Sequence, residues 1–223
     1  FNMEMVRAIL DGRKSCTRRI VKPQQFIGML LDKCKNGAPE KFLKEKKLMF
    51  KPYCDMTDIE LINTAYKAPY QPGDILYVRE TWHKYIKRVG EGESCHLAEF
   101  YGYKASIANS EDADEPWKPS IHMPKEAARI WLKVTDVRVE RLQDITPKGA
   151  ESEGVGNLFY DDIGYGEKNY GTEVDPEYGI AKEQFAWLWE STIKKSDLDR
   201  YGWDANPYVW VIEFERCEKP EGV

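Results

Sequence analysis

Long apolar runs, paired cysteine motifs and a positive net charge are all missing from this sequence. No run approaches the roughly 18 consecutive apolar residues of a membrane-spanning helix, and no signal-peptide pattern is present, so we expect no membrane association. The net charge is −5, whereas proteins that coat nucleic acid by bulk electrostatics are usually basic. A small basic site on an acidic chain suits a short single strand or a nucleoside better than a long duplex.

The number and spacing of the cysteines bear on disulfide-bonded and zinc-binding proteins. There are five, an odd number, at wide spacings and without a CxxC motif. This pattern argues against a disulfide framework, gives a zinc site little support, and favours a reducing cytoplasm. We therefore predict no metal and no cofactor. The chain begins with Phe1 and not with Met, so we expect the natural start to lie upstream.

The sequence contains enough hydrophobic and aromatic residues to form one hydrophobic core. The 223 residues are 42% hydrophobic and 13% aromatic, which fits a single enlarged domain over residues 1–223. Two stretches without clear periodicity, at about 24–68 and 156–181, are predicted to be insertions. No internal repeat is visible.

Short strands and helices alternate along the rest. An apolar face of Met5, Val6, Ile9 and Leu10 predicts a first helix that stops at Gly12. Thr146 and Pro147 are typical of a helix cap and first turn. Runs rich in β-branched and aromatic residues predict strands at 75–78, 101–105, 130–139 and 209–215, and helices are predicted at 147–153 and around 185–192. This order predicts an α+β fold with a small twisted barrel.

Four motifs follow one another along the chain: Gly12–Arg19 (GRKSCTRR), Pro72–Leu76 (PGDIL), Ala150–Gly154 (AESEG) and Val209–Phe214 (VWVIEF). In this order they resemble the ASCH family, whose signature is GxKxxxxR. The resemblance implies a PUA-like small β-barrel of about five or six strands, with flanking helices. It also implies that the partner is RNA or a modified nucleoside.

Three further segments narrow the resemblance: Tyr77–Trp82 (YVRETW), Trp117–Pro124 (WKPSIHMP) and Trp203–Pro207 (WDANP). They look like an enlarged ASCH group that is common in phages and prophages. This implies a cytoplasmic protein of a bacterial or phage-infected cell. The two predicted insertions depart from the compact form of the domain.

Some small ASCH proteins are amidohydrolases that remove the acetyl group from N4-acetylcytidine. The resemblance places their Lys, Thr and Glu on Lys14, Thr17 and Glu153, while Ser15 replaces a usual Thr. In such a reaction Thr17 would attack and Lys14 would accept the proton as a neutral amine. Glu153 would protonate the leaving nitrogen or activate the water for deacylation. Lys14 and Thr17 share a face in a helical turn but not in a strand.

Other residues are candidates for substrate binding, each with a structural alternative. The basic run after the first helix would ordinarily be solvated surface, and Trp82 suits base stacking or core packing equally. Arg79 and Glu80 suit an ion pair or a base edge, and His122 is more often structural. The complete set of predicted binding residues is Arg18, Arg19, Arg79, Glu80, Trp82, Tyr103, Lys104 and His122.

Two alternatives to the hydrolase remain open. One is a non-catalytic RNA-binding module in which Lys14, Arg18 and Arg19 contact phosphates. The other is a phage accessory protein that acts through a protein partner of unknown identity.

Overall fold

The computed structural model describes residues 1–22, 24, 68–106, 116–155 and 179–221. These residues form two compact units, each assembled from segments that are far apart in the sequence. Unit 1 comprises Phe1–Lys14, Ile75–Lys133 and Glu215–Val223, and unit 2 comprises Ser15–Asp74 and Val134–Phe214. The two predicted insertions lie mostly outside the described residues.

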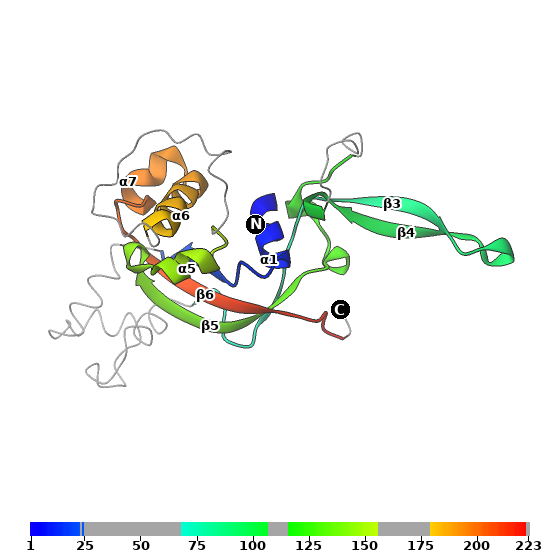
Figure 1. The fold of residues 1–223 in the computed structure, drawn as a ribbon, viewed down its shortest axis with the longest axis horizontal. Coiled ribbons are helices and arrows are strands. Elements are labelled where there is room, and N and C mark those ends of the chain that lie inside the picture. Colours follow the sequence, from blue (N-terminus) through cyan, green and yellow to red (C-terminus); the bar gives the residue numbers. More distant parts are fainter. Residues whose placement is uncertain (23, 25–67, 107–115, 156–178, 222–223) are drawn as a thin grey trace, which may run out of the picture. The chain divides into compact units, whose positions relative to one another are not determined.

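Strands and helices alternate along the chain (Figure 1). The strands are β1 (Cys16–Ile20), β2 (Ile75–Tyr77), β3 (Trp82–Val89), β4 (His96–Tyr103), β5 (Trp131–Arg141) and β6 (Tyr208–Cys217). The α-helices are α1 (Met3–Leu10), α5 (Pro147–Ser152), α6 (Gly179–Thr192) and α7 (Leu198–Tyr201). Single turns of 3-10 helix are η2 (Gly92–Ser94), η3 (Lys104–Ser106), η5 (Ser120–His122), η6 (Lys125–Ala127), η7 (Leu142–Asp144) and η8 (Lys195–Asp197).

The strands form two antiparallel sheets. The larger has the order β1-β6-β5-β2, and its long strands β5 and β6 are visibly curved (Figure 1). The smaller is a ribbon of β3 and β4 alone. The mixed α+β class with a small, curled antiparallel sheet is therefore confirmed. Strands β2, β5 and β6 lie where they were predicted, whereas β4 begins earlier than the predicted 101–105. Neither β1 nor β3 was predicted as a strand.

Unit 1 begins with α1, which is capped by Asn2. The Asn2 side chain accepts a hydrogen bond from the Met5 N–H at 2.9 Å, and Gly12 follows the helix at φ 74°. The predicted apolar face is present, since Val6 and Ile9 are buried. A separate cluster of buried residues, centred on Trp82 and Trp131, forms the core beside β3 and β5.

The core of unit 2 is packed between α6 and the sheet. From α6 it takes Phe185 and Trp189, and from β6 it takes Val209 and Val211. Cys16 of β1 joins the same cluster. Strand β1, which carries the second half of the GRKSCTRR motif, therefore packs one of its faces against this core.

Candidate functional site

Buried polar side chains identify the candidate site. In the part of the chain that the structure describes, the buried polar or charged residues are Lys14, Thr17, Arg18, Glu80, His83 and Glu153. The sequence motifs singled out five of these six, the exception being His83. Burying such a group is costly unless protein partners replace water, so each of the six requires specific contacts.

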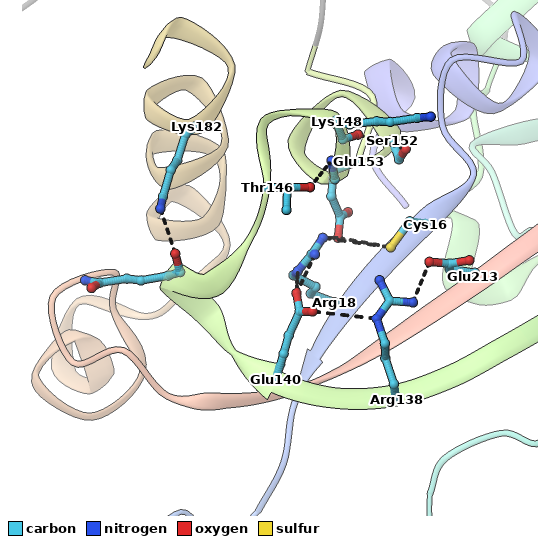
Figure 2. A network of polar contacts seen from close by, with 12 residues as sticks. Cys16, Arg18, Arg138, Glu140, Thr146, Lys148, Ser152, Glu153, Lys182 and Glu213 are labelled. Atoms are coloured by element: carbon cyan, nitrogen blue, oxygen red, sulfur yellow. Dashed lines mark hydrogen bonds and ion pairs between the residues drawn. The ribbon is translucent and has the colours of Figure 1, made fainter. Parts of the chain in front are cut away.

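Arg18 is the centre of a buried ion cluster in unit 2. Its side chain is 2% exposed, and both Nε and Nη2 donate to Glu140 Oε1, at 3.0 and 2.6 Å. Its Nη1 donates to Glu153 Oε1 at 3.1 Å (Figure 2). The guanidinium also lies 5.5 Å from the centre of the Phe185 ring. Arg18 thus joins β1 to β5, to the end of α5 and to α6.

Helix α5 places Glu153 at this cluster. The helix starts at Thr146, whose hydroxyl accepts a hydrogen bond from the N–H of the third helical residue at 3.0 Å, as the sequence predicted. Glu153 is the residue that ends α5, and Gly154 follows it at φ 89°. The N–H of Ser15 donates to the Ser152 carbonyl at 2.9 Å, which ties the end of α5 to the start of β1.

The cluster continues along β5 through Arg138. Arg138 Nε lies 3.6 Å from Glu140 Oε2, and Nη1 donates to Glu213 (Figure 2). Nη1 also donates to Asp136. Burial lowers the pKa of the Arg138 guanidinium, but its hydrogen bonds to Glu213 and Asp136 outweigh this and raise it above the ordinary value. The carboxylates outnumber the two guanidiniums, so this cluster offers no surplus positive charge to a phosphate.

The two faces of β1 have different surroundings. Cys16 and Arg18 share the face that meets Glu153, since the Cys16 sulfur lies 3.9 Å from Glu153 Oε1 and 3.8 Å from Arg18 Nη1. Successive strand residues point to opposite faces, so the Thr17 side chain leaves β1 on the other side. Thr17 is paired in register with Ile212 and is 8% exposed. Strand β1 therefore presents Arg18, and not Thr17, to Glu153.

Lys14 is the last residue of unit 1. Its N–H donates to the Ala8 carbonyl at 2.9 Å, its side chain is buried, and its Nζ lies 5.7 Å from the centre of the Phe1 ring. Glu153 accepts a hydrogen bond from Arg18 through Oε1. The assignment of catalysis to Lys14, Thr17 and Glu153 stays a prediction.

Glu80 forms its ion pair with Arg129, and not with its sequence neighbour Arg79. Both of its carboxylate oxygens accept hydrogen bonds from Arg129, through Nε and Nη2, each at 2.8 Å. Arg129 also donates to Ser106 at 2.7 Å and stacks 4.1 Å above the Tyr103 ring. Arg79 instead is exposed and donates to a backbone carbonyl. No local pattern marked Arg129, because it is 49 residues away from Glu80.

Tyr103 is a packed residue of the same network. Its hydroxyl donates to the Ala127 carbonyl at 2.7 Å, and its ring carries the Arg129 guanidinium. Burial raises the pKa of Tyr103, while the positive charge of Arg129 partly opposes this rise. The hydroxyl therefore acts as a donor inside unit 1.

Trp82 occupies the core, which was one of its two predicted roles. The ring is 6% exposed and packs with Met123, Ala127 and Trp131, and Lys118 Nζ lies 5.0 Å from its centre. Among the described residues, none accepts a hydrogen bond from its buried Nε1. A ring so enclosed does not offer a face to a base, so stacking requires other aromatic residues.

The remaining predicted residues lie at the surface. Arg19, Lys104 and His122 are exposed, and Arg19 donates to the Arg18 carbonyl at 3.1 Å. Within the described ranges, no helix is long and apolar enough to span a membrane. Comparisons of this chain with family models, with curated proteins and with solved structures find no match.

Proposed function

We propose that this chain recognises RNA or a modified nucleoside, and that its fold is of the PUA-like kind. The observation that carries the proposal is the burial of five predicted site residues that lie in the sequence motifs, Lys14, Thr17, Arg18, Glu80 and Glu153. A basic run after a helix would ordinarily be solvated, whereas Lys14, Thr17 and Arg18 are buried. Such burial is costly and implies that the segment is held in a defined conformation.

Under this proposal one face of β1 has a structural role and the other face meets the ligand. Arg18, with Glu140 and Glu153, holds the strand against α5 and β5. The alternate residues Thr17 and Arg19 share the other face, and Arg19 is exposed. A hydroxyl and a guanidinium are groups that contact base edges and phosphates in nucleic-acid complexes. The buried ion cluster therefore positions the strand, and Arg19 is an exposed cation on the other face of β1.

Amide hydrolysis is the second candidate, because the motif resemblance assigns Lys14 and Thr17 to it and each of the two is buried within its own unit. The Thr17 oxygen would bond to the acyl carbon of an N4-acylated cytidine, and the exocyclic nitrogen would leave with a proton. Water would then cleave the ester and release a carboxylic acid. In the first step Lys14 would take the proton from the Thr17 hydroxyl and pass it to the leaving nitrogen. In the second step it would take a proton from the attacking water and return it to the Thr17 oxygen.

One set of variants separates the two candidates. Thr17→Ala and Lys14→Arg are compared with the parent and with Ser15→Ala, a control at an exposed neighbouring position. Binding of a labelled single-stranded RNA and turnover of N4-acetylcytidine are measured, with circular dichroism to confirm folding. Hydrolysis predicts that both variants lose turnover while Ser15→Ala keeps it, because Arg cannot act as a base.

Recognition without chemistry predicts a different result. Neither the parent nor any of the variants turns over the acylated nucleoside. Lys14→Arg binds RNA like the parent, because the positive charge at position 14 is kept. Thr17→Ala then weakens binding by about one hydrogen bond, on the order of 1 kcal/mol. A folded parent that neither binds RNA or a nucleoside nor turns one over would contradict the proposed function itself.

A further inference from the structure

The ribbon of β3 and β4 carries a row of aromatic rings outside the site described above. In this ribbon Tyr85 is paired directly with Phe100, and His83 with Gly102. Directly paired residues lie on the same face, so these four positions form one face of the ribbon. Figure 1 shows the two strands running as a long hairpin.

The rings follow one another along this face. The centres of the Trp117 and His83 rings are 4.5 Å apart, those of His83 and Tyr85 5.3 Å, and those of Tyr85 and Phe100 5.7 Å. The planes of the last two pairs are inclined by only 24° and 26°. We call these four residues the aromatic row. Tyr85 and Phe100 are 37% and 36% exposed, so the outer end of the row is open to solvent.

Gly102 makes room for the inner end of the row. A Cβ atom at this position would lie 1.9 Å from Nε2 of His83 and 2.3 Å from its Cδ2. The His83 ring therefore lies across the backbone of β4, between Trp117 and Tyr85. An alanine at position 102 would force this ring to move.

Charge on the ribbon is distributed unevenly. Strand β3 carries Lys84, Lys87 and Arg88 and no acid, although the whole chain is acidic. The one carboxylate of the two strands, Glu99, is on the face opposite the row, where it pairs with Lys84 at 2.7 Å. Lys87 stands on the face of the row. The aromatic row thus adjoins a lysine, and neither strand contributes a carboxylate to its face.

We propose that the aromatic row binds single-stranded RNA, with bases stacked on Tyr85 and Phe100 and a phosphate near Lys87. Exposed aromatic rings beside cations are the combination by which proteins hold single strands. The exposed aliphatic side chains Ile86 and Leu97 lie on the opposite face, whereas the face of the row carries Val89 beside the exposed rings of Tyr85 and Phe100. This inference rests on the proposed function and names the surface that contacts the strand.

The test removes the π-surfaces while keeping apolar volume. The double variant Tyr85→Leu/Phe100→Leu is compared with Ile86→Ala/Leu97→Ala, which truncates exposed residues on the other face of the same ribbon. Binding of a fluorescein-labelled oligouridine of about 12 nucleotides is measured by anisotropy in the full chain. We expect the leucine variant to bind about tenfold or more weakly and the control to bind like the parent.

Further measurements separate the possible failures. Gly102→Ala should also weaken binding, with an unchanged far-ultraviolet circular dichroism spectrum, because it displaces His83 without removing an aromatic residue. Equal binding by the leucine variant and the parent would overturn the inference and leave RNA recognition standing. A parent that binds a nucleoside but no RNA would overturn the inference and restrict recognition to the nucleoside. Self-association of the parent that the leucine variant loses, without any loss of RNA binding, would also overturn it. A parent that binds neither RNA nor nucleoside would overturn both proposals.

Discussion

Replacement of Arg18 by leucine tests whether the buried ion cluster holds the motif strand in place. The variant removes the two hydrogen bonds to Glu140 and the one to Glu153. Leucine keeps much of the side chain's apolar volume, so the main loss is the positive charge. Glu153, whose side chain is 4% exposed, is then left in the interior without its guanidinium.

The size of the effect follows from which carboxylates stay buried. Removal of one partner of a buried ion pair typically destabilises a protein by about 3–5 kcal/mol. Glu140 is 20% exposed and remains near Arg138, so its charge is partly relieved. We therefore expect a loss of about 3 kcal/mol, which for a chain of this size lowers the melting temperature by about 6–12 °C.

The assay is urea unfolding followed by tryptophan fluorescence, with Arg19→Leu as the matched control. Arg19 is the exposed neighbour on the same strand, and its replacement should change the free energy of unfolding by no more than about 0.5 kcal/mol. Arg18→Leu combined with Glu153→Leu should recover part of the loss, because no uncompensated charge remains at Glu153. If Arg18→Leu matches Arg19→Leu, the cluster does not stabilise unit 2 and the reasoning is refuted.

Three further predictions concern the Arg129–Glu80 pair, Glu153 and Tyr103. Arg129→Lys should reduce the free energy of unfolding by about 1–3 kcal/mol in urea titrations, because lysine cannot pair with both oxygens of Glu80; an unchanged value would show that the paired geometry is unimportant. Glu153→Gln should reduce the free energy of unfolding by about 1.5–3 kcal/mol, whereas Glu151→Gln, at an exposed position, should reduce it by less than about 0.5 kcal/mol. Equal losses would contradict the identification of Glu153 as the buried partner of Arg18. The raised pKa of Tyr103 means that the folded chain holds this proton more tightly than the unfolded chain, so stability should fall as pH rises above the ordinary tyrosine value of about 10. Tyr103→Phe should show a shallower fall between about pH 9 and 11, and an identical profile would exclude this contribution.

Local sequence signals accounted for the elements whose cause is local. The Thr146-Pro147 cap predicted the start of α5, and the dense apolar run of β6 predicted a strand at its observed place. Strand β3 was missed because WHKYIKRV is mostly polar and is exposed over its last six residues. Its register is set by pairing with β4, and pairing partners cannot be identified from one strand alone.

The sequence motifs singled out several residues that are buried in the structure, but they did not indicate the contacts that these residues make. The motifs singled out Arg18, Glu80 and Glu153, all of which are buried. Their partners were not predictable, because Arg18 meets Glu153 across 135 positions and Glu80 meets Arg129 across 49. Such ion pairs depend on how separate segments pack, which leaves no periodic signal in the sequence.

The most direct test of the central claim is a binding isotherm for the unmodified full chain. Fluorescence anisotropy with a labelled single-stranded RNA, and calorimetry with cytidine and N4-acetylcytidine, are performed at low and at physiological salt. We predict saturable binding to at least one of these ligands, with RNA binding weakened by salt because phosphates are contacted. A folded chain that shows no saturable binding to any of them would contradict the claim that this protein recognises RNA or a nucleoside.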